Sequence, residues 1–285
     1  MFFILQKEDR LNFDDVQLAI IESLLKSFKH QHEYVLMKES EFYSEDDSFN
    51  GAERRLKEAS EFPEKYQNAI ALGEVTFVGK ALKIFHGIDN ENAIEVPPCL
   101  REYRFLKRKY SIVPVWDIPR EGRFFIKDAT QQKSFSYKGE LENFVYDEMF
   151  EPRTNEYDLS LRFDYEHLYQ ISEVVNVLAE YRAYILGGQL ETVSHFAGDA
   201  YLLPDMELLK DAIRIYNEQP DCPKSYSIDL MITPEGTAIT EVHNFMCLGL
   251  YNVNWDEKLL FALRDGWNYV LNYNTQQSEY SNFEE

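Results

Sequence analysis

Residues 225–251 constrain the fold more than any other stretch, because they read as a β-hairpin that carries acidic side chains. The first arm is expected over residues 226–233 and the return arm over residues 238–244. Between the arms, Pro234 and Gly236 supply the fixed φ and the tolerated positive φ that a tight turn requires. The pattern therefore predicts an antiparallel pair of strands in the last third of the chain.

Three side chains of this hairpin favour a cation site. Asp229 lies in the first arm, while Glu241 and His243 lie two positions apart in the second and share one face of the sheet. Carboxylates on adjacent strands repel each other unless a cation or a proton offsets them. An oxygen-rich set suits Mg²⁺, which completes its shell with phosphate oxygens. The alternative is a solvated hairpin face with incidental acids, in a chain of net charge −21.

A lysine-bearing segment upstream favours the cation-site interpretation. Residues 123–128 read as a strand that contains Lys127, and Lys133 follows in a polar segment that ends at Gly139. A lysine in a strand beside a polar loop can hold a phosphate group as a point charge. The alternative is a lysine whose apolar stem packs at the strand end while its ammonium group reaches solvent.

A second hairpin is expected around Gly187-Gly188, with arms over residues 179–186 and 190–196. Glu180 and Arg182 share one face of its first arm. An arginine at that position either forms a cross-strand ion pair or reaches a phosphate through two parallel hydrogen bonds. The sequence alone leaves both readings open.

The rest of the chain adds a β-α-β opening, which suggests an α/β layer. Strands are expected at residues 2–6, 34–37, 69–78 and 170–177, helices at 16–28, 206–216 and 257–273, and a loop with a charged helix at 38–67. Pro97-Pro98 indicates a domain boundary. We therefore expect an α+β protein with one domain at residues 1–97 and another at 98–285, the latter divided into subdomains at 98–170 and 171–285.

Charge and cysteine usage exclude several classes of protein. The net charge of −21 argues against a nucleic-acid or anionic-membrane partner, because phosphate attraction requires clustered lysine and arginine. Three cysteines without CxxC spacing fit a reduced, cytoplasmic protein. No apolar run approaches the roughly 20 residues of a membrane span, and the first ten residues become charged too soon for a signal peptide. The sequence does not indicate an oligomeric state.

The order of these elements over residues 98–272 resembles the ATP-grasp superfamily, in particular its clade named for one arginine and two lysines. The similarity lies in the two lysine segments, the E-x-R arm before Gly187-Gly188, and the E-V-H-N-F and G-L-Y segments after Asp229. The resemblance implies two α+β subdomains that clasp ATP, preceded by a small α/β domain. It also implies an ADP-forming, Mg²⁺-dependent ligase that activates a small-molecule or peptide carboxylate as an acylphosphate for attack by an amine or thiol.

The resemblance also implies a role for each matching residue. Lys127 would contact the α- and β-phosphates, and Lys133 the β- and γ-phosphates. The strand at Glu173, Val174 and Val175 would bind adenine through its backbone. Arg182 would stabilise the transferring phosphoryl group or the acylphosphate. Asp229 and Glu241 would hold Mg²⁺.

This chain departs from the family pattern at two places. The usual E-x-N metal motif has His243 in the Asn position, with Asn244 next to it. Strand alternation favours His243 as the third ligand, whereas the preference of Mg²⁺ for oxygen favours Asn244. The glycine-rich phosphate loop of many relatives is replaced by A-T-Q-Q-K-S-F-S. A nucleotide-binding regulatory or interaction module with reduced catalysis is therefore the second hypothesis. A third, an acidic decoy that mimics nucleic acid, rests only on the net charge of −21.

Overall fold

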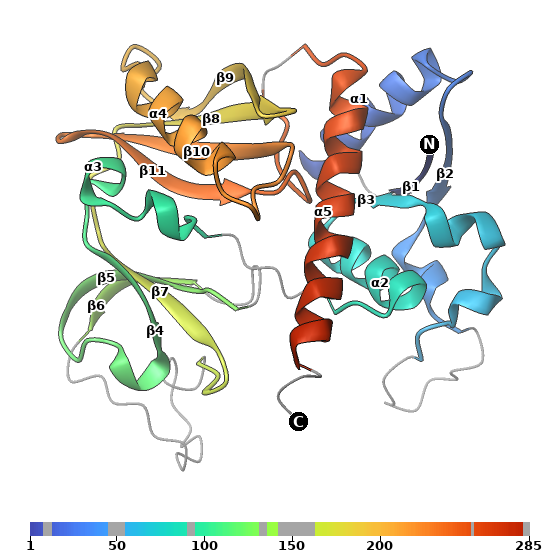
Figure 1. The fold of residues 1–285 in the computed structure, drawn as a ribbon, viewed down its shortest axis with the longest axis horizontal. Helices are drawn as coiled ribbons and strands as arrows, with labels where there is room; N and C mark the ends of the chain where they lie inside the picture. Colours follow the sequence, from blue (N-terminus) through green and yellow to red (C-terminus); the bar gives the residue numbers. More distant parts are fainter. Residues whose placement is uncertain are drawn as a thin grey trace.

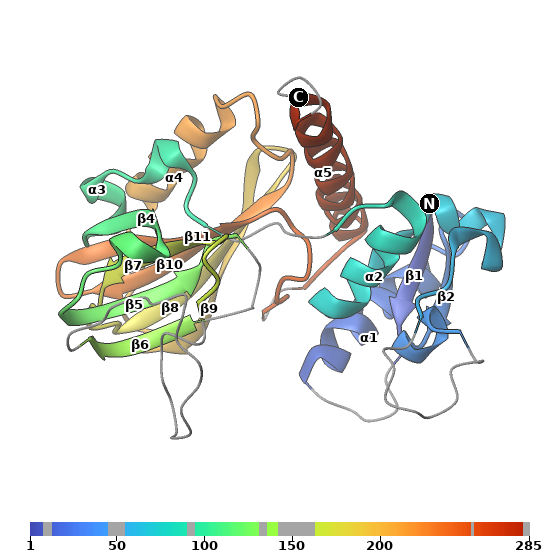
Figure 2. The same cartoon turned by 90° about the horizontal axis from the view of Figure 1, so that it is seen from below.

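The computed structural model describes residues 1–7, 13–44, 55–89, 95–130, 136–141, 163–251 and 254–281. Three sheets organise these residues: a parallel sheet in the order β2-β1-β3 and two antiparallel sheets in the orders β4-β7-β5-β6 and β11-β10-β8-β9. Figure 2 shows both antiparallel sheets on one side of the molecule and the parallel sheet on the other. This mixture of helices with segregated sheets confirms the predicted α+β class.

The N-terminal unit contains the predicted β-α-β opening. Its elements are β1 (Phe2–Gln6), α1 (Phe13–Ser27), β2 (Glu33–Met37), β3 (Ile70–Leu72) and α2 (Val75–His86). Strand β1 lies between β2 and β3 and is buried from its second residue to its last, as expected for an apolar run in a parallel sheet. Helix α2 ends at His86, and the φ of 68° at the next residue, Gly87, allows its N–H to bond the carbonyl groups of the last turn.

Two predictions for the N-terminal unit were wrong. The strand expected at residues 69–78 ends at Leu72, and helix α2 begins three residues later. The buried residues of α2, Phe77, Val78, Ala81 and Leu82, recur at the three- and four-residue spacing of a helix. Instead of a charged helix, the described part of residues 38–67 contains 3₁₀ turns at Glu39–Phe42, Ala59–Glu61 and the start of Glu64–Asn68.

The second sheet contains β4 (Tyr110–Pro114), β5 (Gly122–Asp128), β6 (Ser136–Leu141) and β7 (Leu168–Glu173). A single helical turn, α3 (Tyr103–Leu106), precedes it. Strand β7 is shorter than predicted, because regular pairing stops at Glu173 and residues 174–178 form the connection to β8.

The third sheet contains both predicted hairpins. It is built from β8 (Ala179–Leu186), β9 (Gln189–Gly198), β10 (Tyr226–Thr233) and β11 (Gly236–His243), and α4 (Met206–Asn217) lies between the hairpins in sequence. Gly187 and Gly188 have φ values of 58° and 78°, as a two-residue hairpin turn requires. The Asp205 side chain accepts hydrogen bonds from the backbone N–H groups of Glu207 and Leu208, which fixes the start of α4.

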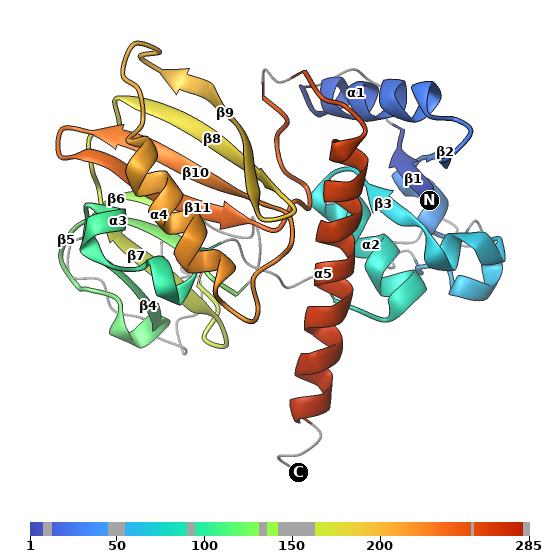
Figure 3. The ribbon, with the colours of Figure 1, turned by 45° about the horizontal axis from the view of Figure 1, so that its top comes forward.

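Helix α5 (Lys258–Ser281) lies between the N-terminal unit and the third sheet (Figures 1 and 3). Its residues Leu259, Leu260 and Trp267 belong to the hydrophobic core that surrounds β1–β3. A Cβ atom on Gly266 would collide with the carbonyl oxygen of Asn244, so the helix passes close to the end of β11. Each antiparallel sheet has a hydrophobic core of its own. The division into residues 1–97, 98–170 and 171–285 stays a prediction.

Candidate functional site

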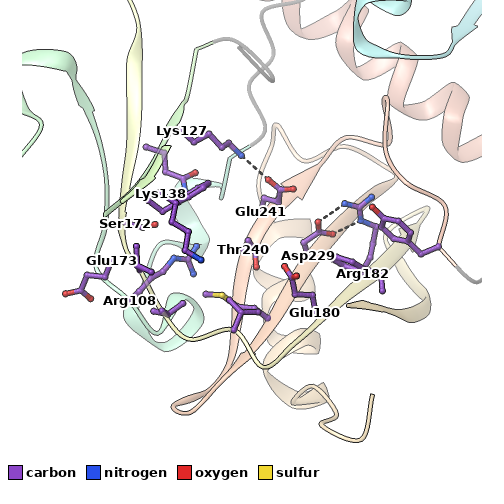
Figure 4. Close-up of a pocket in the computed structure, with 18 residues that line it drawn as sticks. Arg108, Lys127, Lys138, Ser172, Glu173, Glu180, Arg182, Asp229, Thr240 and Glu241 are labelled. Carbon is purple, nitrogen blue, oxygen red and sulfur yellow. Dashed lines mark hydrogen bonds and ion pairs between the residues drawn. The ribbon is translucent and has the colours of Figure 1, made fainter. Parts of the chain in front are cut away.

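A cleft of about 380 Å³ separates the two antiparallel sheets. Figure 4 shows Lys127, Lys138 and Arg108 on the side of the β4–β7 sheet, and Glu241, Asp229 and Arg182 on the side of the β8–β11 sheet. One wall therefore carries cationic side chains and the other carries the two acids of the predicted hairpin. The two distant segments that were singled out from the sequence converge on one cleft.

Three charged residues form a row across neighbouring strands of the acidic wall. Asp229 on β10 lies opposite Arg182 on β8 and opposite Glu241 on β11. The Arg182 guanidinium donates through Nε and Nη2 to the two Asp229 carboxylate oxygens, both at 2.6 Å. Both side chains are buried, so the pair is held in a two-bonded geometry away from water.

A β-bulge shapes the acidic wall next to this row. Asp229 pairs with Glu241, but Leu230 pairs with Ile239, so Thr240 is an additional residue in β11. Strict alternation would direct Thr240 and Glu241 to opposite faces of the sheet. With the bulge, both residues line the cleft.

Lys127 reaches across the cleft to the acidic wall. Its Nζ donates to Glu241 Oε2 at 2.9 Å, and Figure 4 shows that this contact bridges the two sheets. Burial opposes ionisation of Glu241, but the His243 imidazole and the Lys127 ammonium group outweigh it and hold the pKa of the carboxyl below its ordinary value. Glu241 is therefore an ionised acid with a cation already beside it.

His243 and Asn244 take different positions at the end of β11. His243 Nε2 lies 2.8 Å from Glu241 Oε1 and 3.8 Å from Asp229 Oδ2. Asn244 Oδ1 instead accepts a hydrogen bond from the backbone N–H of Met246. Asp229, Glu241 and His243 each offer one donor atom, all within 4.8 Å of one another. The donor set of two carboxylates and an imidazole fits a divalent cation.

The three residues that were predicted to bind adenine all line the cleft. The Glu173 carboxylate, however, accepts a hydrogen bond from the backbone N–H of Lys109 at 2.9 Å and is directed away from the acidic wall in Figure 4. Val174 and Val175 lie beyond the end of β7, in the connection between the two sheets. The backbone there does not belong to a sheet ladder, which leaves its polar groups available for another partner.

Lys133 lies outside the described residues, so its predicted phosphate contact stays a prediction. Two other cations line the cleft that were not among the predicted site residues. Lys138 lies opposite Phe125 in the β5–β6 ladder. Arg108 is buried, donates to the carbonyl oxygens of Leu106 and Ile239, and has its pKa lowered to about 10 by burial.

Glu180 is a third cleft residue whose role the sequence did not indicate, although its shared face with Arg182 was visible. Burial raises the pKa of its carboxyl, and the charges of Asp229 and Glu241 raise it further. Three acids thus face the cleft within electrostatic reach of one another. A cation bound among them would relieve their repulsion.

The loop after β11 closes the far side of the Arg182 guanidinium. Nη1 of Arg182 and the hydroxyl group of Tyr184 both donate to the carbonyl oxygen of Gly249, at 3.1 and 2.7 Å. The Arg182 guanidinium also lies over the ring of Tyr251, 5.0 Å from its centroid. These contacts fix the loop that carries the G-L-Y segment against the acidic wall.

Comparison with known proteins gives one family. Residues 105–259, more than half of the chain, match the model of the ATP-grasp domain that forms family 2 of the clade named for one arginine and two lysines. No curated protein matches the chain. Among the described residues, no helix has the length and apolar character needed to cross a membrane.

Several solved structures align over nearly the full length. The D-alanine–D-alanine ligase from Bacillus anthracis complexed with ATP is 14% identical, with 100% of this chain and 99% of that chain covered and a TM-score of 0.46. A RimK domain protein from Sphaerobacter thermophilus is 12% identical, with 95% and 99% covered and a TM-score of 0.44. The macrocyclase MdnC from Microcystis aeruginosa, bound with its precursor peptide MdnA, is 11% identical, with 95% and 100% covered and a TM-score of 0.40.

Proposed function

The chain belongs to the ATP-grasp domain family, in family 2 of the arginine-and-two-lysines clade, and from this premise we propose that it is an ADP-forming ligase that joins a carboxylate to an amine or a thiol. The contact that best supports the proposal is the one between Lys127 and Glu241 across the cleft. It puts a lysine amine and the paired acids in one space, as the handling of a triphosphate and its cation requires. The substrates would be small molecules or a peptide.

The reaction has two steps in this proposal. A carboxylate oxygen of the first substrate attacks the γ-phosphorus of ATP, the bond to the β-phosphate oxygen breaks, and ADP leaves. The amine or thiol of the second substrate then attacks the carbonyl carbon of the acylphosphate, inorganic phosphate leaves, and the nucleophile loses a proton. The protein contributes position and charge rather than a covalent intermediate.

The cationic residues of the cleft are assigned to the phosphates and the backbone of the connection to adenine. Lys127 exchanges Glu241 for the α- and β-phosphate oxygens, and Lys133 is assigned to the β- and γ-phosphates. Arg182, held in place by Asp229, presents its guanidinium to the transferring phosphoryl group or acylphosphate. The backbone of Glu173, Val174 and Val175 binds adenine in the connection between the sheets.

Asp229, Glu241 and a third ligand would hold the divalent cation, expected from the family to be Mg²⁺. When bound, this cation would offset the charge on the phosphate oxygens. The carboxylates of Asp229 and Glu241 fit the role of metal ligands, because each accepts hydrogen bonds and still has lone pairs for a cation. A cytoplasmic location without nucleic-acid or membrane partners completes the proposal.

The second hypothesis, a nucleotide-binding module without turnover, is kept because His243 stands where the family motif has Asn. Both hypotheses predict that ATP at 100 times its dissociation constant stabilises the folded protein by about 2.7 kcal/mol and so raises its melting temperature. A thermal-shift series with ATP, ADP and GTP, with and without Mg²⁺, tests this shared prediction. If no nucleotide shifts the melting transition, both hypotheses fail.

ADP formation separates the two hypotheses. With mixtures of carboxylates and amines, the ligase releases ADP, and Lys127→Ala or Asp229→Asn abolishes the release. Lys210→Ala, on the exposed face of α4, is the matched control and keeps full activity. A nucleotide-dependent thermal shift with no ADP release from any mixture would favour the module instead.

A further inference from the structure

The two ring nitrogens of His243 have unequal surroundings. Nε2 faces Glu241 Oε1 and Asp229 Oδ2, whereas Nδ1 is buried and has no hydrogen-bond partner among the described residues. The side chain is only 8% exposed. A buried polar atom without a partner is costly, so its presence beside two acids calls for a physical reason.

The hydroxyl group of Ser227 also lacks a hydrogen-bond partner among the described residues. Its oxygen is fully buried. Ser227 lies directly opposite His243 in the β10–β11 ladder, where Cβ atoms of facing residues are about 4.5–5.5 Å apart. Serine χ1 has three staggered positions, so the hydroxyl group can turn about the Cα–Cβ bond toward the facing residue.

The charges around the two acids are already balanced. Asp229 is paired with Arg182, and Glu241 is paired with Lys127. These pairs weaken the attraction of the site for every divalent cation alike, so the nature of the third ligand decides between metals. An imidazole ligand adds no charge but supplies a nitrogen lone pair, which favours first-row transition metals over Mg²⁺.

The oxygen alternative to His243 is engaged elsewhere. The Asn244 amide oxygen caps the turn by accepting from Met246 N–H, and the Asn244 backbone oxygen lies against Gly266 of α5. Recruiting the Asn244 side chain would break this turn and move backbone that the helix holds in place. His243 needs no such movement, since its Nε2 already lies among the acids.

We propose that Asp229, Glu241 and His243 Nε2 form a site selective for a first-row transition-metal dication such as Mn²⁺ over Mg²⁺, with Ser227 Oγ accepting a hydrogen bond from His243 Nδ1–H. This inference rests on the proposed function and deepens it by naming the class of its metal. Coordination through Nε2 requires the ring proton to reside on Nδ1, and Ser227 is the positioning residue that satisfies it. The same pairing would give a partner to each of two buried polar atoms on facing residues of the ladder.

The test uses the full chain with Mn²⁺ alone, without nucleotide. Electron spin echo modulation of bound Mn²⁺ is expected to show a directly coordinated imidazole nitrogen, and labelling histidine with heavy nitrogen is expected to change that signal. In competition, Mg²⁺ is expected to displace Mn²⁺ poorly. Bound Mn²⁺ without the nitrogen signal, or equal affinities for the two ions, would overturn the proposal.

Variants assign the signal to named residues. His243→Asn is expected to abolish the nitrogen signal and to reduce the preference for Mn²⁺, while His30→Asn, which removes an exposed imidazole of the N-terminal unit, leaves both unchanged. Ser227→Ala is expected to keep the nitrogen signal and weaken Mn²⁺ binding about 10–100-fold. Unchanged affinity in Ser227→Ala would overturn the positioning role.

The outcomes remain separable from those of the proposed function. Circular dichroism of each variant checks the fold, and ATP-dependent thermal shift checks the cleft. A protein that binds ATP with Mg²⁺ and releases ADP, yet shows no nitrogen signal with Mn²⁺, keeps the ligase proposal and refutes the metal selectivity. A protein that shows the nitrogen signal but no ADP release refutes the ligase proposal and keeps the site.

Discussion

The two walls of the cleft hold their charges in different ways. On the wall formed by β8–β11, Arg182 and Asp229 are side by side on adjacent strands, are both buried, and neutralise each other. On the wall formed by β4–β7, Lys127 is partly exposed and finds its acid across the cleft, at Glu241. One charge pair is internal to a sheet, and the other connects two sheets.

This difference indicates that the charged groups of the β8–β11 wall are in position before a ligand binds. Strand register sets the Arg182–Asp229 pair within one sheet, and the loop at Gly249 and Tyr251 holds the other side of the guanidinium. The Lys127–Glu241 pair exists only when the two sheets approach each other. A phosphate and a cation can take the place of the second pair, whereas the first pair is present within its sheet beforehand, and three variants test this distinction.

The largest effect is expected for Arg182→Met. The substitution leaves Asp229 buried beside Glu241 without a compensating charge, and breaking a buried pair in this way costs about 3–5 kcal/mol of folding free energy. Urea unfolding of the ligand-free protein measures the loss. Arg214→Met, at an exposed arginine on α4, is the control and should leave the unfolding midpoint unchanged.

A smaller loss of stability is expected for Lys127→Met. Its ion pair is partly exposed, so the free energy of unfolding should fall by about 1 kcal/mol or less. The ATP-dependent thermal shift should disappear in the same variant, because the amine that meets the phosphates is gone. Equal destabilisation by Lys127→Met and Arg182→Met would contradict the distinction between the walls.

The smallest effect is expected for Glu180→Gln, and it depends on pH. Burial and the neighbouring acids raise the folded-state pKa of Glu180. Below about pH 4.3, the pKa of an unfolded glutamate, both states are protonated and the variant equals the wild type. As pH rises through the folded pKa, the wild type loses stability, so at neutral pH the variant should melt about 2 °C higher. Scanning calorimetry across this pH range, repeated with Mn²⁺, should show that the cation reduces the difference.

The sequence was most informative where a local pattern determines the structure. Turn residues fix both hairpins, and the two-residue alternation then places Arg182, Asp229 and Glu241 on one face. Their alignment in one row also depends on the bulge at Thr240 and on the pairing of β8 with β10, two strands that α4 separates in sequence. The charged residues of the acidic wall were therefore predictable from the sequence, but their alignment across the strands was not.

The prediction of secondary structure failed where packing against other elements decides between a strand and a helix or sets the end of a strand. Residues 69–78 are apolar enough for a strand or a buried helix, and packing of Phe77 and Leu82 in the N-terminal core selects the helix. The end of β7 at Glu173 depends on where the two sheets separate, which no local signal marks. Arg108 became a site candidate only through its contact with Ile239, which is distant in sequence, and Ser227 only because its buried hydroxyl group has no partner among the described residues.

The close approach of α5 to β11 has a consequence for synthesis of the chain. The core around β1–β3, which is translated first, takes Leu259, Leu260 and Trp267 from a helix that is translated much later. The earliest sheet therefore remains exposed on one side until those residues leave the ribosome. We therefore expect nascent chains stopped before Lys258 to bind chaperones. Once α5 is made, it covers the core around β1–β3 and packs against the end of β11.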